Sequence, residues 1–459
     1  MKFAHHAAVR LLPTMVLVAM SSGFASDAPQ VAMPQTRAQE LADLEVVRRE
    51  YLPKDMAFSP ATRALAVAQL EHMQRMAGSM SPMDFAVGLA ELGALNDNAH
   101  SGMRRRDPRV QPTARLPLRL LWLADGLIVA RAGGEAQDLA GARVLKIEGR
   151  APAALYSGAK VLLGGSDAGR KLWLNDWIET AGTLHALGLA RSPQSVALTL
   201  RLPSGRVVAR LLGMQPVLAQ AVMTADLRRI WSPQPLIGEH NWKPALAPDH
   251  APLYLQDAER PFRSVTLAAE HALYVQFRSN EDEANESISA FTEQVRKQID
   301  ATHPRHLILD LRFDIGGNLL TTLAFMRTLS ASAPGQNYLL IGSNTFSAGI
   351  ISAAAFKQGG GARVTIVGEE VGDRMHFWSE GANVELPNSH YTFRYADGQF
   401  NLSEGCSGEP GCMDDRYHID VNFVSLVPDV RAPLTADAYL AGRDPALDWI
   451  AASIARQRD

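Results

Sequence analysis

Residues 307–318 read LILDLRFDIGGN, an apolar run followed by a pair of glycines. A short apolar run that ends at turn formers is typical of a strand buried on both faces. Gly316 and Gly317 directly after the strand let backbone amides approach a ligand closely, although any tight turn also uses glycine. The segment therefore predicts a buried strand followed by a turn at which a site can form.

Strands and helices alternate on both sides of this segment. Apolar runs predict strands and helical spacing of apolar residues predicts helices, the strands at 273–277, 338–341 and 364–367 and the helices at 286–299, 319–329 and 348–356. Such alternation through short connections indicates an α/β layer with mostly parallel strands. Sites in these layers gather where strands give way to helices.

Ser347 lies at one of these transitions, between the strand at 338–341 and a helix of small residues. As a nucleophile it would attack a carbonyl whose oxygen faces the amide of Ala348, because a helix N-terminus favours the negative charge that develops there. Alternatively, Ser347 merely caps the helix. The segment alone does not decide between the two interpretations.

Five motifs occur in one order along the chain: Asp310-Leu311-Arg312-x-x-x-Gly316-Gly317-Asn318, Thr345-Phe346-Ser347-Ala348, Val367-Gly368-Glu369, Leu386-Pro387-Asn388-Ser389 and Val427-Pro428-Asp429-Val430. Over roughly residues 273–454 this order resembles the C-terminal-processing (tail-specific) serine peptidase superfamily. The resemblance implies a crotonase-like or ClpP-like α/β catalytic domain. It also implies Ser347 as the nucleophile and an oxyanion hole formed by the amides of Gly316 or Gly317 with Ala348.

The superfamily activates its serine with a downstream lysine or with a histidine from an N-terminal helical region. Asp373 stands where the lysine would lie, and Lys357 is expected to face solvent. Residues 95–101 loosely match a Leu-x-Asp-x-His-Ser pattern of the Ser-His branch, which includes the tricorn core. The resemblance therefore implies His100 as the general acid/base, a role that suits an imidazole near neutral pH. Without the other motifs, a histidine in a turn reads as a solvated residue.

A third group should orient the imidazole, as the acid does in a serine triad. In the tricorn type this acid shortly precedes the Pro-Asp motif, where the chain offers Asp414, Asp415 and Asp420. The resemblance does not choose among the three. Two residues depart from the family pattern, since Ala99 replaces a serine before the histidine and Asp314 stands where members commonly carry Asn.

The remaining chain divides by periodicity. Residues 36–93 show three helices, with Ser59-Pro60 and Ser81-Pro82 as N-cap pairs, and residues 116–212 show period-two runs with one helix at 175–189. Residues 138–149 resemble part of a PDZ domain. We predict a signal peptide at 1–25, a helical region at 26–112, a degenerate PDZ-like domain at 113–214, a linker or crossing segment at 215–251 and a peptidase-like catalytic domain at 252–459.

The N-terminus predicts export to the periplasm or the medium. Lys2 and Arg10 precede an apolar stretch at residues 11–20 and then small residues, which is typical of a cleaved signal peptide, with an uncleaved anchor as the alternative. No later stretch is long and apolar enough to cross a bilayer. In an oxidising compartment the neighbouring Cys406 and Cys412 are expected to pair. Their spacing lacks the further ligands of a zinc site, so no metal is expected.

The 459 residues are 47% hydrophobic and 20% charged, which is ample for packed domains. The net charge of −3 lacks the excess of basic residues that nucleic-acid binding would require. We therefore expect a cofactor-free serine peptidase acting on peptides or proteins. Two other functions fit the same residues: a non-catalytic binding protein, as the retinoid-binding relatives of the superfamily show, and an esterase or amidase. Nothing in the sequence points to a particular substrate or oligomeric state.

Overall fold

The apolar run before the glycine pair is a strand in the computed structural model of the protein. The structure describes residues 36–105, 108–111, 114–216, 230–236, 239, 241–283, 285–422 and 424–457. The strand is β12, and its sheet has the order β10 (Phe262–Leu267), β11 (Ala272–Phe277), β12 (His306–Asp310), β13 (Asn337–Ile341), β14 (Val364–Gly368) and β19 (Val430–Arg431). Only β10 pairs antiparallel within this sheet. The predicted α/β layer is confirmed.

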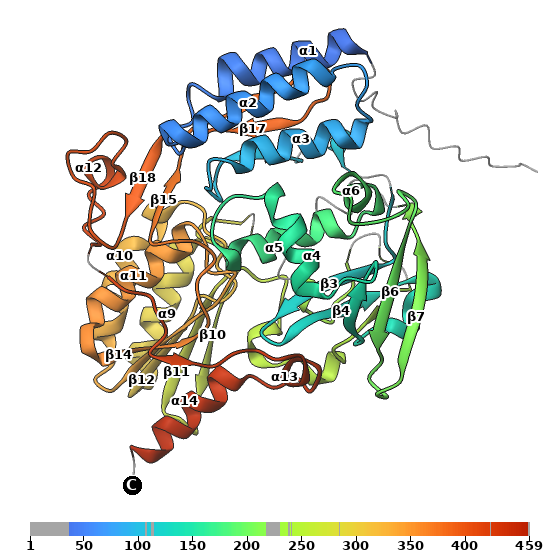
Figure 1. The fold of residues 1–459 in the computed structure, drawn as a ribbon. Coiled ribbons are helices and arrows are strands. Elements are labelled where there is room, and N and C mark those ends of the chain that lie inside the picture. Colours follow the sequence, from blue (N-terminus) through green and yellow to red (C-terminus); the bar gives the residue numbers. More distant parts are fainter. Residues whose placement is uncertain are drawn as a thin grey trace, which may run out of the picture. The chain divides into compact units, whose positions relative to one another are not determined.

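Helices lie on both faces of this sheet (Figure 1). Alternate side chains of β12 pack against different helices. Leu307 and Leu309 share a core with three helices, α9 (Ile288–Thr302), α10 (Leu323–Leu329) and α11 (Ala348–Gly360). Ile308 lies between them in sequence and instead packs with α14 (Pro445–Arg456). Both faces are covered, which explains why the central residues of the strand, 307–309, are all apolar. The predicted helix at 319–329 divides into a 3₁₀ turn, Leu319–Thr321, and α10.

Arg312 joins the end of β12 to the start of α14. Its guanidinium donates to Asp310 at 2.6 Å and to Asp444, the N-cap of α14, at 2.9 Å. Both carboxylates are buried, and the Tyr274 hydroxyl also donates to Asp310 at 2.6 Å. A buried charge persists only where such partners surround it. The Asp-Leu-Arg motif thus fixes the edge of the sheet from which the two glycines leave.

The three predicted N-terminal helices are present as α1 (Arg37–Val46), α2 (Pro60–Met76) and α3 (Pro82–Ala94). Ser59 and Ser81 cap α2 and α3 as predicted, and Ser81 forms a capping box with Asp84. A π-helical turn at Val47–Tyr51, which periodicity did not predict, continues α1.

A second, antiparallel sheet has the order β3 (Leu118–Leu123), β4 (Gly126–Ala132), β5 (Arg143–Ile147), β6 (Ser195–Arg201) and β7 (Val207–Gly213). Its helices are α4 (Pro152–Ala159), α5 (Asp167–Ile178) and α6 (Ala181–Ala186). The single helix predicted at 175–189 was wrong in its bounds, because Ser166 caps an earlier start and Glu179 and Thr180 interrupt it. The PDZ-like character and the domain boundaries stay predictions.

Buried ion pairs attach the predicted crossing segment to this sheet. Glu239 accepts from Arg131 at 2.7 Å and lies 3.1 Å from Arg119. A short strand, β9 (Lys243–Pro244), pairs with β4. The described residues all belong to one compact unit.

The remaining short strands and helices lie mostly in the C-terminal half, together with three strands from the N-terminal half. A three-stranded sheet combines β1 (Gly102–Arg104), β17 (Thr392–Arg394) and β16 (Asn383–Glu385). Two pairs follow, β15 (His376–Ser379) with β18 (Gly398–Asn401) and β2 (Ala114–Arg115) with β8 (Gln215–Pro216), and two short helices, α12 (Met413–Tyr417) and α13 (Ala436–Leu440). The β1–β17 pairing connects the chain next to His100 with the C-terminal half.

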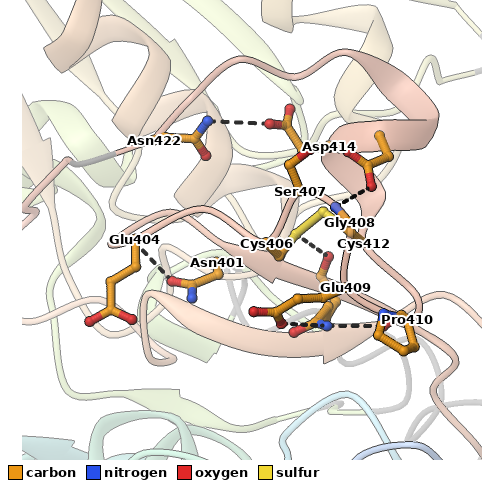
Figure 2. The surroundings of a disulfide bond; sticks show 12 residues. Asn401, Glu404, Cys406, Ser407, Gly408, Glu409, Pro410, Cys412, Asp414 and Asn422 are labelled. Atoms are coloured by element: carbon orange, nitrogen blue, oxygen red, sulfur yellow. Dashed lines mark hydrogen bonds between the residues drawn. A yellow bond between two sulfur atoms is a disulfide. The ribbon is translucent and has the colours of Figure 1, made fainter.

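Cys406 and Cys412 form a disulfide, as predicted, with a Cα–Cα distance of 5.5 Å (Figure 2). The disulfide closes a loop beside β18. The backbone of Cys412 also pairs with that of Gln399 in β18, as a single parallel β-bridge. The predicted signal peptide at residues 1–25 lies outside the described residues. Over the part of the chain that is described, no helix has the length and apolarity needed to cross a membrane.

Candidate active site

The turn that carries Ser347 is held by hydrogen bonds on both of its sides. It leads from β13 into α11, and the Thr345 amide donates to the Gly342 carbonyl at 2.8 Å. The Thr345 hydroxyl donates to the Leu311 carbonyl at 2.8 Å, which ties the turn to the chain just beyond β12. Ser347 has φ 55° and ψ −126°, a conformation that residues with a side chain rarely adopt. Such strain clusters at functional sites.

The hydroxyl of Ser347 does not cap α11. Ser347 occupies the N-cap position, yet its side chain makes no capping hydrogen bond. The residue is half-buried, so the hydroxyl is not sealed inside the core. The interpretation of Ser347 as a mere helix cap is therefore wrong.

The first residue of the glycine pair, Gly316, passes directly over this serine. Gly316 and Gly317 have φ values of 97° and 134°, which favour glycine. A Cβ atom on Gly316 would lie 2.6 Å from the Ser347 Cβ and 2.9 Å from the Ala348 amide nitrogen, closer than real Cβ atoms come. Only a glycine permits this approach, so the loop and the serine turn form one surface.

Asp314 supports the loop from beneath. Its fully buried carboxylate accepts from the Gly316 amide at 3.0 Å, and its carbonyl accepts from the Phe346 amide at 2.9 Å. With the Asn280 side-chain amide oriented to satisfy its neighbours, that amide donates to the same carboxylate at 2.6 Å. Because Asp314 engages the Gly316 amide, Gly317 and Ala348 are the predicted oxyanion donors that remain. Ala348 begins α11, where an amide has no carbonyl within the helix to bind.

His100 lies beside the serine turn, between two aromatic rings. Its imidazole stacks on Phe346, the residue before Ser347, with a centroid distance of 4.4 Å, and on Phe377 at 5.0 Å. The side chain is buried rather than solvated. The structure thus brings His100, distant in sequence, next to the residue that precedes the predicted nucleophile.

Asp373 is the carboxylate that faces this histidine. The Nδ1 atom of His100 lies 3.4 Å from Oδ2 of Asp373, an ion-pair distance that exceeds a well-formed hydrogen bond. Both ring nitrogens of His100 are buried, and neither makes a hydrogen bond to a described residue. Burial lowers the pKa of His100, and the Asp373 carboxylate opposes this shift. The neutral imidazole, the form that can accept a proton, is therefore favoured near neutral pH.

The three predicted orienting acids lie elsewhere, on the segment around the disulfide. Asp414 accepts from the Asn422 side chain (Figure 2) and from the Asp420 amide at 2.7 Å. Asp415 accepts from Ser407 and Gly408. Asp420 is exposed. The acid in contact with His100 is Asp373 instead.

Three residues of this site were missed in the sequence, namely Asp373, Phe346 and Phe377 as neighbours of His100. Asp373 drew notice only as a replacement for a lysine. Its position after the strand β14, at the same sheet edge as the serine turn, was the signal that could have assigned it.

Lys357 takes no part in the site. Its ammonium donates to the Val364 carbonyl at 2.5 Å and lies 3.8 Å from Asp429. It is half-buried rather than facing solvent as expected. Within the described residues, no group of three or more His, Cys, Asp or Glu side chains is arranged to hold a metal ion.

Comparison with known proteins places the fold. No family model matches the sequence, and no curated protein matches it. Mature CPAF complexed with lactacystin is similar in structure, with a TM-score of 0.56 at 13% identity over 91% of this chain and 98% of that chain. Another structure of mature CPAF gives 0.52 at 14% identity over 91% and 96%. The photosystem II D1 C-terminal processing protease gives 0.38 at 14% identity over 91% and 97%. The likeness to CPAF shows a shared fold.

Proposed function

We propose that the protein is a serine peptidase in which Ser347 attacks the carbonyl carbon of a peptide bond. The observation that carries the proposal is the strained conformation of Ser347 beneath the glycine loop. The hydroxyl of Ser347 makes no capping hydrogen bond to α11. A serine held in this way at the end of a strand, before a helix, has the setting of a nucleophile. The shared fold with CPAF supports the same interpretation.

In the proposed reaction, His100 takes the proton of the Ser347 hydroxyl as the bond to the carbonyl carbon forms. The negative charge on the carbonyl oxygen is held by the amides of Ala348 and Gly317. His100 then gives its proton to the leaving amine, and water releases the acyl group with His100 again as base. Asp373 stabilises the imidazolium and selects the tautomer with its proton on Nδ1.

The compartment is part of the proposal. We place the mature protein in the periplasm or medium, after removal of residues 1–25. The Cys406–Cys412 disulfide supports an oxidising compartment.

A fluorophosphonate probe tests the nucleophile. The expected result is one covalent adduct on Ser347, absent in Ser347→Ala and formed far more slowly in His100→Ala. The other serines of the chain serve as the internal control, since the proposal predicts no adduct on them. Equal labelling of Ser347→Ala, or no labelling of the wild type, would contradict the assignment.

A second function, a non-catalytic binding protein on the same fold, is favoured by one observation. The imidazole of His100 is enclosed by two phenyl rings and has no hydrogen bond to Ser347 among the described residues. In enzymes without substrate such bonds are often long, so this geometry alone does not exclude catalysis. The binding protein predicts no adduct with the probe. An esterase or amidase would be labelled, and profiling with ester and peptide substrates separates it from a peptidase.

A further inference from the structure

A cavity of about 410 Å³ opens beside the serine turn. One wall is the end of β3 with one face of α5, and the other is the chain that follows β14. Ser343, in the loop that leads to Ser347, also lines it. The loops around the cavity and the nucleophile are joined, because the Gly372 amide donates to the Thr345 carbonyl at 2.8 Å. The cavity therefore adjoins the loop that carries Ser347.

The walls combine an apolar surface with several charges. Trp122 and Trp231 contribute the largest rings. Two of the carboxylates already have partners: Asp167 accepts from the Tyr156 hydroxyl at 2.6 Å, and Glu370 lies 3.6 Å from Arg431. The ammonium of Lys171 lies 5.4 Å from the centre of the Tyr156 ring and 5.9 Å from that of Trp122.

Glu369 is the carboxylate without such a partner. It is half-buried and accepts one long hydrogen bond, from the Leu434 amide at 3.3 Å. No Lys, Arg or His among the described residues forms an ion pair with it. The nearby Arg312 is already bound to Asp310 and Asp444. Glu369 lines both this cavity and a smaller neighbouring one of about 50 Å³.

The energetics of this carboxylate favour an incoming cation. Burial raises the pKa of Glu369, and the Leu434 amide and the charges of Arg312 and Lys171 only partly oppose the shift. A carboxylate in a partly dehydrated cavity gains most from a ligand that brings both positive charge and hydrogen-bond donors. The tryptophan rings suit the apolar stem and the flat face of a guanidinium.

We propose that this cavity is a specificity pocket for a basic substrate side chain, arginine or lysine, with Glu369 as its counter-charge and Trp231 as an apolar wall. The inference rests on the proposed peptidase function, since it names the class of peptide that the site takes. Its recognition step involves binding alone and no bond is made or broken in the pocket.

Binding to the Ser347→Ala protein separates this inference from the catalytic one. Ten-residue peptides of Ala, Ser and Gly would carry a single arginine at each position in turn, and each would be paired with a peptide carrying citrulline, its neutral isostere. Affinities would be measured by fluorescence anisotropy. At one position the arginine peptide is expected to bind about tenfold more tightly or better, as for a hydrogen-bonded charge pair. The double variant Ser347→Ala/Glu369→Gln should lose this preference.

Glu293→Gln is the matched control. Glu293 lies on α9, away from the cavity, and pairs with Lys297 at 3.6 Å, so the arginine preference should persist. Glu369→Lys should reverse the preference toward a peptide with glutamate at the same position. Equal binding of arginine and citrulline peptides, an arginine preference that survives Glu369→Gln, or no binding of any peptide would overturn the pocket. Failure of the wild type to cleave a peptide that shows the preference would overturn the peptidase function and leave the pocket standing.

Discussion

The backbone at Ser347 is held at φ 55° by the contacts around it rather than by its own preference. Thr345 fixes the turn on one side and the glycine loop presses on the other. A non-glycine residue in this conformation costs about 1–3 kcal/mol. Holding the Ser347 hydroxyl in this fixed place therefore lowers the free energy of unfolding.

Replacing Ser347 by glycine should release this strain. We expect Ser347→Gly to be about 1 kcal/mol more stable than the wild type in chemical denaturation, because glycine adopts positive φ freely. Ser347→Ala keeps the Cβ atom and should show almost no gain. Equal stability of the two variants would show that the backbone here is not strained.

Asp373 governs the protonation of His100 in the proposed mechanism. Its carboxylate raises the pKa of His100 against the effect of burial, so Asp373→Asn should lower that pKa further. The acid limb of the pH profile of kcat/KM should move to lower pH, and kcat should fall by about 10²-fold or more as the imidazole loses its orientation.

Asp420→Asn is the control for Asp373→Asn, since Asp420 was predicted as an orienting acid and is exposed in the structure. We expect it to leave both kcat and the pH profile unchanged. A loss of activity in Asp420→Asn together with an unchanged Asp373→Asn would assign the role to the acid that the sequence predicted.

Among single residues, the sequence predicted those site residues that belong to local motifs, and it did not predict the contacts between distant ones. Ser347 and the glycine pair follow strands whose ends meet at one edge of a parallel sheet, so their proximity could be deduced. The contact between His100 and Asp373 could not, because 272 intervening positions separate them and no local pattern records which strand end a distant turn reaches.

At the scale of elements, the chain between β15 and α12 shows how the site is supported from behind. Phe377 of β15 stacks on His100, and Phe400 of β18 stacks on Phe377 at 5.2 Å. Gln399, next to Phe400, donates to the Pro410 carbonyl inside the disulfide loop at 2.9 Å. The disulfide therefore lies beneath the strand pair that covers the histidine.

Removal of this disulfide should cost modest stability. Cys406 and Cys412 are six positions apart, and closing so short a loop stabilises by about 2 kcal/mol in the chain-entropy description. The double variant Cys406→Ser/Cys412→Ser should lose that amount in urea denaturation under oxidising conditions. Adding a reductant should lower the stability of the wild type and leave the variant unaffected. An unchanged wild type in reductant would show that the bridge adds nothing.

Helices and strands were predicted well where the spacing of apolar residues was regular. They were predicted poorly where a capping residue sets the start or end of a helix. Strands β11 to β14 and the strands of the antiparallel sheet appeared near their predicted runs, since continuous burial in the first set and alternation in the second leave a clear pattern. The edge strands β10 and β19 were not predicted. The helix expected at 175–189 began at Asp167 instead, because Ser166 and not the apolar spacing sets its start.

At the scale of the whole molecule, residues 164–166 contact the chain beside both His100 and Asp373. Gly164 and Gly165 pack against the backbone of Asn98 and Ala99, beside His100. The Ser166 hydroxyl donates to the Gly372 carbonyl at 3.0 Å, beside Asp373. One short segment next to α5 thus fixes the positions of two turns that lie far apart in the sequence.

Gly165→Val tests this support. Gly165 has φ 96°, and a Cβ atom there would lie 2.6 Å from the Cβ of Ala99, so valine should displace the turn that carries His100. We expect the rate of fluorophosphonate labelling to fall by about tenfold or more, as when a catalytic base is misplaced. Gly205→Val is the control, because Gly205 has φ 84° with nothing within 4 Å of the added atom. Equal slowing in both variants would attribute the effect to general destabilisation.

Hydrolysis of a peptide library by the wild type and by Ser347→Ala tests the central claim most directly. Mass spectrometry of the products would report each cleaved bond and its rate. We predict cleavage by the wild type and a loss of about 10³-fold or more in Ser347→Ala, the scale on which serine peptidases depend on their nucleophile. The same cleavage in both proteins, or cleavage in neither, would contradict the assignment of Ser347 as the nucleophile of a peptidase.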